Sequence, residues 1–247
     1  MTGHWGSESV AGHPCDVYTP PRINDDGFVL LYLHGYHMGS LREQTPYLQA
    51  FDRHGLPVVC PVTRQSWWTD RRCPAFDPQL SPQRHILDNV LPFMQQRWGV
   101  TPPRIGLFGT SMGGQGALRL AYQFPDRFPV VAAIAPAIDF HHRLREGDEI
   151  LAQMYRDVED ARQDTAILHI HPLNWPRYQF FCCDPADGDW FDSADRLRMK
   201  LMSLGVPFEY DLETTAGGHG FGYYNRMADR AIDYLASRLR DRQRQLL

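Results

Sequence analysis

Short uninterrupted apolar runs recur along the chain, and longer stretches with helical spacing of apolar residues separate them. A continuous apolar run of about four to eight residues is typical of a strand buried on both faces, as in a parallel sheet. Because such runs alternate with helical patterns, we predict an α/β fold with a mostly parallel, doubly wound sheet flanked by helices. The predicted strands cover residues 28–33, 57–60, 105–108, 130–134, 178–183 and 208–212.

Other segments carry weaker patterns. Residues 10–19 alternate loosely before Pro20-Pro21 and indicate an edge strand. A helix is expected to begin at Ser81-Pro82 and to kink at Pro92, since proline favours the first helical turn and disrupts the interior. The amphipathic spacing of 193–202 and of 226–240 predicts two further helices.

The chain length and composition favour one domain. At 247 residues and 43% hydrophobic content, the sequence can bury a large core. Residues 141–165 are highly charged with scattered apolar positions, which predicts one or two amphipathic helices inserted above the sheet beside the pocket. We therefore expect residues 1–247 to form one domain with a helical insertion at about 141–165.

Charge narrows the choice of partners. The formal net charge of −4 provides no cationic field for nucleic acid or for an anionic membrane surface, so a small-molecule substrate fits better. The five cysteines are odd in number and lack the spacing of a metal finger, and the first residues carry no basic start or apolar run. We expect a reduced cytoplasmic chain without cofactor or metal, and leave open whether it forms a homo-oligomer.

Residues 105–118 carry the strongest chemical signal. An apolar strand leads into Gly109-Thr110-Ser111-Met112-Gly113, and a helical pattern follows. This strand-turn-helix context is typical of a nucleophile elbow, in which the serine has a strained backbone and side chains at the flanking glycines would collide with neighbouring backbone. An ordinary glycine-rich turn is the alternative, and the context favours the elbow.

The turn after the predicted strand 28–33 supplies a second part of a site. His34-Gly35-Tyr36 makes a sharp turn at which a backbone N–H can point into the pocket above the sheet edge. We predict that the N–H groups of Tyr36 and Met112 form an oxyanion hole. The His34 side chain is expected to hold this loop rather than to react.

A base and an acid follow in chain order. His219 lies in the glycine-lined turn 216–220 beyond the last predicted strand, and four aspartates follow the strand 178–183. A serine hydroxyl needs an imidazole to accept its proton, and a carboxylate must orient that imidazole. Asp184 directly follows the strand and precedes a proline that keeps it extended, whereas Asp187 lies where the loop has begun to turn. Asp189 and Asp192 lie nearer the next helix and suit its N-terminus.

Three segments together resemble the α/β-hydrolase superfamily, and within it the esterase group around S-formylglutathione hydrolase (esterase D). They are Leu30–Gly35, Gly109–Leu118 and Gly217–Gly220. The resemblance implies a carboxylic ester hydrolase without cofactor, whose triad is Ser111, His219 and an aspartate of the 184–189 cluster. In that group a glycine and two further residues precede the acid; here Asp184 takes the place of the glycine and Asp187 that of the acid, so we choose Asp187. Thr110 and the loop after Gly35 depart from the group's pattern, so its glutathione thioester is not carried over.

The loop after the strand 57–60 contains Trp67, Trp68 and Arg71, and such loops line the site in α/β folds. We predict that these three side chains bind substrate; the alternative is that the tryptophans cover a hydrophobic seam while the arginine faces water.

The same site would serve several reactions. We predict a serine esterase that forms an acyl-enzyme, with a thioesterase or an acyltransferase as the alternative. A serine peptidase is disfavoured because members of this fold with that activity usually carry a gating domain. A non-catalytic binding member is disfavoured because all three reactive side chains are present.

Overall fold

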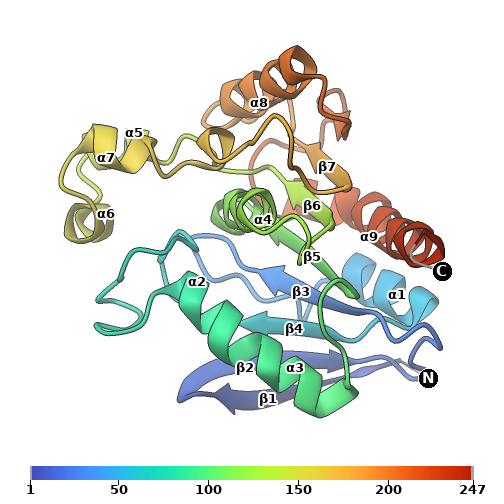
Figure 1. The fold of residues 1–247 in the computed structure, drawn as a ribbon. Helices are drawn as coiled ribbons and strands as arrows, with labels where there is room; N and C mark the ends of the chain where they lie inside the picture. Colours follow the sequence, from blue (N-terminus) through green and yellow to red (C-terminus); the bar gives the residue numbers. More distant parts are fainter. Residues whose placement is uncertain (1, 246–247) are drawn as a thin grey trace.

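The computed structural model describes residues 2–245, and the eight strands of that range form one mixed sheet (Figure 1). Its order is β1-β2-β4-β3-β5-β6-β7-β8. The strand pairs from β4 to β8 are parallel, whereas β1–β2 and β2–β4 are antiparallel. The predicted α/β fold is confirmed. The strands are β1 His4–Val10, β2 His13–Thr19, β3 Val29–Leu33, β4 Val58–Pro61, β5 Ile105–Thr110, β6 Val130–Ile134, β7 Tyr178–Cys182 and β8 Glu209–Asp211.

Helices cover both faces of the sheet, as two glycines of β5 show. A Cβ at Gly106 would lie 2.7 Å from Leu30 and 3.1 Å from Leu239, which belongs to helix α9 (Phe221–Arg244). A Cβ at Gly109 would lie 2.2 Å from the carbonyl oxygen of Gly113 in helix α4 (Met112–Gln123). Because these glycines are three residues apart, their side-chain directions point to opposite faces. Helices α9 and α4 therefore pack on opposite faces of the sheet.

Figure 1 shows how the remaining helices are arranged around the sheet. Helix α1 (Thr45–His54) packs against α9, and α2 (Pro82–His85), a π-helical turn (Ile86–Val90) and α3 (Leu91–Trp98) cross the sheet as one rod. Helix α8 (Phe191–Leu204) follows β7. The segment between β6 and β7 contains α5 (His141–Arg145), α6 (Glu149–Met154), α7 (Val158–Arg162) and a 3₁₀ turn (Ala166–Leu168).

Strand register brings distant loops to one edge. Thr110 is opposite Ile134, Ile134 is opposite Cys182, and Cys182 is opposite Asp211. The strands β5, β6, β7 and β8 therefore end at nearly the same level. Because they are parallel, the loops that follow them meet at the carboxyl edge of the sheet, where ligands bind in open α/β folds.

Several predicted elements need correction. Residues 10–19 are not one edge strand: β1 and β2 form an antiparallel hairpin, and β2 pairs with β4, so β1 lies at the edge. The insertion contains three short helices rather than one or two, because Asp148 and Asp157 each cap a new helix. Helix α1 was missed. The helix beginning at Ser81 is confirmed, and the Ser81 side chain accepts a hydrogen bond from the Arg84 N–H.

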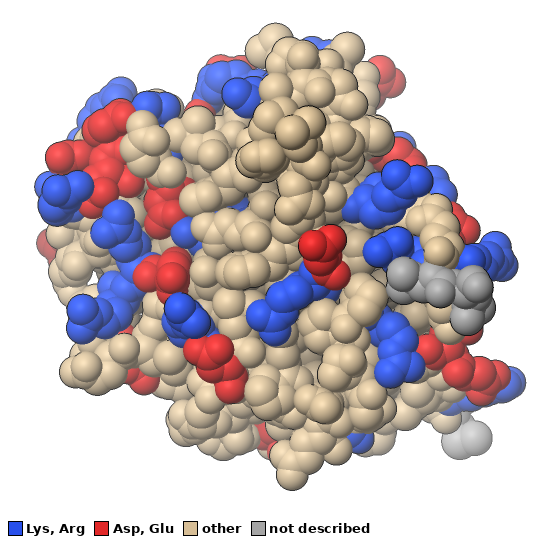
Figure 2. Space-filling view, viewed as in Figure 1, with Lys and Arg blue, Asp and Glu red and all other residues tan. Residues whose placement is uncertain are grey.

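The surface carries both signs of charge. Figure 2 shows acidic and basic side chains interspersed at the left of the view, over the region of α5, α6 and α7 in Figure 1. Across residues 2–245, no helix combines the length and the apolar character needed to cross a membrane.

Candidate active site

Ser111 lies in the sharp turn between β5 and α4. Its φ is 54° and its ψ is −120°, a conformation that costs a non-glycine residue energy. Two hydrogen bonds to the turn after β6 hold it: the Ser111 N–H donates to Ile134 O at 3.0 Å, and the Ala137 N–H donates to Ser111 O at 3.0 Å. A Cβ at Gly113 would lie 1.8 Å from Leu33 O. The predicted elbow geometry, including the need for glycine beside the serine, is confirmed.

The structure brings Ser111, His219 and Asp187 together in one hydrogen-bonded chain. His219 Nε2 lies 2.9 Å from Ser111 Oγ, and His219 Nδ1 lies 2.7 Å from Asp187 Oδ2. The Asp187 carboxylate is buried and also accepts hydrogen bonds from the Trp190 N–H and the Cys183 thiol. With Nδ1–H donating to this carboxylate, Nε2 presents its lone pair to the serine hydroxyl.

The other aspartates of the acid loop have different surroundings. Asp189 and Asp192 are exposed, and neither side chain caps α8, whose N-cap is Trp190. Asp184 is fully buried and accepts hydrogen bonds from three backbone N–H groups: Ala186 at 2.8 Å, Ala216 at 2.6 Å and Gly218 at 2.9 Å. Asp184 therefore ties the acid loop to the turn that carries His219.

The role of Asp184 was missed by the sequence analysis. Two of its three donors, Ala216 and Gly218, lie 32 and 34 residues further along the chain, so no local pattern indicates them. Burial alone would raise the pKa of Asp184, but the N–H groups of Ala216, Ala186 and Gly218 together outweigh burial and lower it. The carboxylate is therefore charged when it holds the histidine turn.

His34 holds the loop after β3, as predicted for its side chain. The Thr63 N–H donates to His34 Nε2 at 3.0 Å, so Nδ1 carries the proton and donates to Gly35 O at 2.8 Å. Burial lowers the pKa of His34 to about 4, although the bond to Gly35 acts in the opposite direction. A Cβ at Gly35 would lie 3.3 Å from Ser111 Cβ, which shows how closely this loop passes over the elbow.

The two predicted oxyanion donors flank Ser111. Met112 is the first residue of α4, where backbone N–H groups have no partner within the helix. Tyr36 lies on the facing loop, and its hydroxyl donates to Asp148 Oδ2 at 3.0 Å while the Arg143 guanidinium lies 4.8 Å from its ring centre. The helical insertion thus contacts the loop beside the serine. The oxyanion role of both N–H groups stays a prediction.

The prediction of substrate contact for Trp67, Trp68 and Arg71 does not agree with their positions. Both tryptophans are buried, with exposed fractions of 1%. Trp68 Nε1 donates to His34 O at 3.0 Å, and the Trp67 ring stacks on Phe140 at 4.9 Å. Arg71 pairs with Asp160 at 3.0 Å, in a separate depression. The loop packs beneath the site because the tryptophans fill the space beside α4, which the alternative interpretation anticipated.

A cavity of about 210 Å³ opens directly onto the serine. Its apolar walls come from aromatic side chains, and its polar groups belong to the elbow and the histidine turn. The residues that line it are Gly35, Tyr36, His37, Gly39, Thr110, Ser111, His219, Gly220, Phe221 and Tyr224. The cavity is therefore small and holds the reactive hydroxyl at its surface.

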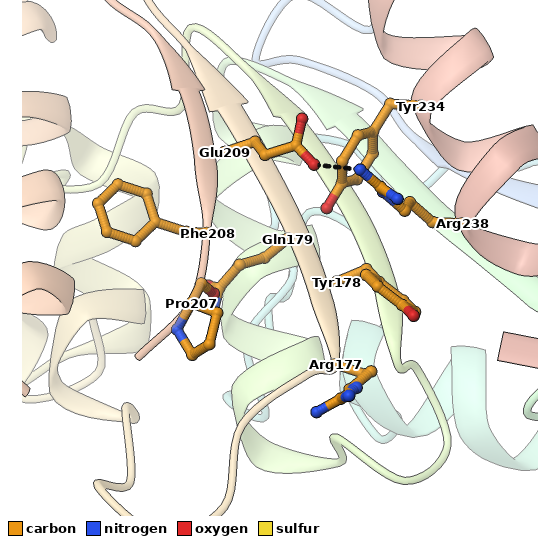
Figure 3. A pocket seen from close by; sticks show the side chains of 8 residues that line it. All are labelled: Arg177, Tyr178, Gln179, Pro207, Phe208, Glu209, Tyr234 and Arg238. Carbon is orange, nitrogen blue, oxygen red and sulfur yellow. Dashed lines mark hydrogen bonds and ion pairs between the residues drawn. The ribbon is translucent and has the colours of Figure 1, made fainter. Parts of the chain in front are cut away.

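A second, larger cavity of about 340 Å³ lies near the opposite edge of the sheet, beside the first residues of β7 and β8 (Figure 3). Figure 3 shows the Glu209 carboxylate directed at the Arg238 guanidinium, and the two groups are 2.7 Å apart. Arg238 also pairs with Asp241 at 2.9 Å. The charges of Glu209 and Arg238 thus neutralise each other inside this cavity.

Comparison with known proteins shows the family of the chain. The model of the family described as "Putative esterase" matches residues 16–195. S-formylglutathione hydrolase of Bos taurus is 27% identical over 141 residues, which cover 49% of this chain and 50% of that protein. The chain thus aligns with about half the length of this curated relative.

Solved structures extend the likeness in fold over nearly the whole chain. An S-formylglutathione hydrolase from Agrobacterium tumefaciens superposes with a TM-score of 0.75 at 18% identity, covering 96% of this chain and 94% of that one. A ferulic acid esterase superposes with a TM-score of 0.75 at 15% identity, covering 97% and 100%. At these identities the likeness establishes the α/β-hydrolase fold.

Proposed function

The chain belongs to the Putative esterase family, and from that premise we propose that it is a serine hydrolase that cleaves carboxylic esters through Ser111, His219 and Asp187. The observation that carries the proposal is the hydrogen-bonded chain from Ser111 Oγ through both ring nitrogens of His219 to the buried Asp187 carboxylate. The Ser111 end of this series of hydrogen bonds lies in a cavity that admits a small molecule. The geometry supports nucleophilic catalysis with an imidazole base.

Acylation uses each part of this chain. Ser111 Oγ bonds to the ester carbonyl carbon as its proton passes to His219 Nε2, 2.9 Å away. The tetrahedral intermediate places its negative oxygen between Ser111 and the loop at Gly35, where the N–H groups of Tyr36 and Met112 would donate to it. Nε2–H then protonates the leaving alcohol as its bond to the acyl carbon breaks. Asp187 keeps the imidazole oriented and stabilises its charged form.

Deacylation repeats the sequence with water. A water molecule gives one proton to His219 Nε2 as its oxygen bonds to the acyl carbon. Ser111 Oγ takes that proton back when the acyl–oxygen bond breaks, which releases the acid and restores the enzyme. Nothing in this cycle requires a cofactor, and the five cysteines are free and buried, which suits a reducing cytoplasm.

A thioester is the second candidate substrate, because the curated relatives are named S-formylglutathione hydrolases. The same acyl chemistry applies with a thiol as the leaving group. An alcohol in place of water as the final acceptor would make the protein an acyltransferase with the same residues.

A substrate panel with a covalent label tests the proposal. We expect a fluorophosphonate to modify one residue, Ser111, as located by peptide mass spectrometry, and to abolish turnover of aryl esters in proportion to the labelled fraction. Matched esters and thioesters of acetate, butyrate and octanoate should show a preference for short chains, since the cavity holds about 210 Å³. With methanol added, formation of the methyl ester would report acyl transfer to an alcohol in place of water. Labelling elsewhere, or turnover that survives full labelling, would refute the proposal.

A further inference from the structure

Two hydroxyl groups approach the same nitrogen of His219. Besides Ser111 Oγ at 2.9 Å, the Tyr224 hydroxyl lies 2.8 Å from His219 Nε2. Tyr224 also lines the cavity that contains the serine. An Asp–His–Ser chain needs only the serine at this atom, so the tyrosine hydroxyl is an additional group at the point where protons are transferred.

The position of Tyr224 is fixed from several directions. It lies in the first turn of α9, its N–H donates to Gly220 O at 2.9 Å, and its side chain is only 5% exposed. Its ring stands perpendicular to the His219 ring at 5.5 Å, and its carbonyl oxygen accepts the Tyr47 hydroxyl at 3.1 Å. The hydroxyl is therefore held at Nε2 by buried packing.

A neutral imidazole whose Nδ1–H faces a carboxylate offers one lone pair at Nε2. Two hydroxyls cannot both donate fully to this lone pair, so in the resting enzyme the hydroxyls of Tyr224 and Ser111 each make only a weak, neutral interaction with Nε2. When Nε2 takes the serine proton, it becomes an N⁺–H donor, and the Tyr224 oxygen can accept from it. Hydrogen bonds to charged groups are roughly twice as strong as neutral ones, so the contact favours the charged state over the resting state.

We propose that Tyr224 is a further catalytic residue, whose hydroxyl oxygen accepts a hydrogen bond from protonated His219 Nε2 in both acylation and deacylation. This inference rests on the proposed serine-hydrolase function. Tyr224 stabilises each tetrahedral intermediate without gaining or losing a proton. The transferred proton moves from Ser111 to Nε2 to the leaving group, and in the second half from water to Nε2 to Ser111.

The electrostatics agree with a hydroxyl that keeps its proton. Burial raises the pKa of Tyr224, and the smaller effect of the nearby Ser111 hydroxyl lowers it. The tyrosine therefore stays neutral at working pH and is able to accept through its oxygen while its own proton points to the serine or to a substrate oxygen.

The test replaces only the hydroxyl, with Tyr224→Phe, and uses Tyr122→Phe as the matched control. Tyr122 is also buried, and its hydroxyl donates to Gln179 at 2.8 Å; neither residue lines the cavity at Ser111. Fluorophosphonate titration gives the concentration of competent sites, and stopped-flow measurements with an aryl ester give the acylation rate and the deacylation rate per site. For Tyr224→Phe we expect both rates to fall about tenfold, because a charged hydrogen bond exceeds a neutral one by about 1.4 kcal/mol, which corresponds to a factor of ten in rate. For Tyr122→Phe we expect unchanged rates per site.

Proton NMR separates this role from a structural one. The low-field signal of the Nδ1–H between His219 and Asp187 should persist in Tyr224→Phe, because that contact does not involve the tyrosine. Wild-type rates per site in Tyr224→Phe, or a loss that comes only from fewer competent sites, would overturn the inference and leave the serine-hydrolase function intact. A wild-type protein that neither labels nor turns over esters would overturn both.

Discussion

The cavities at the two edges of the sheet differ in size and in chemistry, and the larger cavity is the one whose charged groups are already paired. The cavity beside β7, β8 and α9 holds about 340 Å³, against about 210 Å³ for the cavity at Ser111. In the larger one, Arg238 and Glu209 satisfy each other (Figure 3). In the smaller one, the hydroxyl groups of Ser111 and Tyr224 both approach His219 Nε2.

The proposed site is therefore favoured by its converging polar groups and not by its volume. A site for chemistry needs groups that still have interactions to offer to a substrate. In the larger cavity, Arg238 forms ion pairs with Glu209 and Asp241. The smaller one presents the Ser111 hydroxyl on a turn that backbone hydrogen bonds fix, and an imidazole that a buried carboxylate orients. Each of the following predictions tests one side of this contrast.

Removal of the nucleophile should produce the largest effect. We expect Ser111→Ala to lower kcat for an activated short-chain ester by about 10⁴-fold or more, because the acyl-enzyme cannot form. Circular dichroism and the melting temperature should stay close to wild type, since the elbow backbone keeps its hydrogen bonds. Turnover near the wild-type rate would place the chemistry outside the smaller cavity.

Loss of the charge at Asp187 should follow. Asp187→Asn leaves the shape of the loop intact but presents an amide to His219 Nδ1, so kcat should fall by about 10³ to 10⁴. Steady-state kinetics on the same ester measure this, with Asp189→Asn, an exposed neighbour, as the control that should stay near wild type. A large loss in the control alone would move the acid to another residue of the loop.

Asp184→Asn should mainly affect stability. One amide oxygen cannot replace a carboxylate that accepts three N–H bonds, so we expect a loss of about 1–3 kcal/mol in the free energy of unfolding and a smaller loss of kcat than for Asp187→Asn. Because folding lowers the pKa of Asp184, its contribution is present above its unfolded pKa of about 3.9 and is lost as pH falls through the folded value. Urea unfolding from about pH 6 down to pH 3 should therefore be less pH-dependent in Asp184→Asn than in wild type. Equal slopes would contradict this.

The smallest effect is expected at the larger cavity. Arg238→Ala removes exposed and half-buried ion pairs with Glu209 and Asp241, which contribute at most about 1 kcal/mol. We expect kcat/KM for esters to change by less than about twofold. A specific fall in kcat/KM at unchanged melting temperature would break the contrast and connect this cavity to the reaction.

The sequence was sufficient for the elements whose signal is local. Continuous apolar runs identify β3, β4, β5, β6 and β7 because buried parallel strands have no polar face. The strand β1 was missed because its residues are mostly polar and half exposed. The elbow was recognisable because a strand, a glycine-flanked serine and a helical pattern follow one another directly in the sequence. Asp187 was chosen from its place in the turning loop together with the pattern of the resembling family.

The rest depends on contacts between distant segments. Nothing near Trp68 indicates burial: its ring occupies the space beside Gly116, where a Cβ would lie 2.4 Å from Trp68 Cβ. Two donors to Asp184 belong to the histidine turn, which follows β8 in the sequence. Tyr224 contacts His219 only because α9 begins directly after that turn. A side chain whose partners come from another part of the chain leaves no periodicity for a sequence pattern to detect.

The order of the site residues along the chain also has a consequence for biosynthesis. The elbow at Ser111 is held by the turn after β6, whereas the acid loop, the histidine turn and α9 are synthesised later. Domains generally fold as units. The elbow and the residues proposed to act with it are therefore expected to reach their native positions together, after β7, β8 and α9 have been synthesised. Under the proposed function, a polypeptide that ends before His219 has no base for Ser111 and is unable to form an acyl-enzyme.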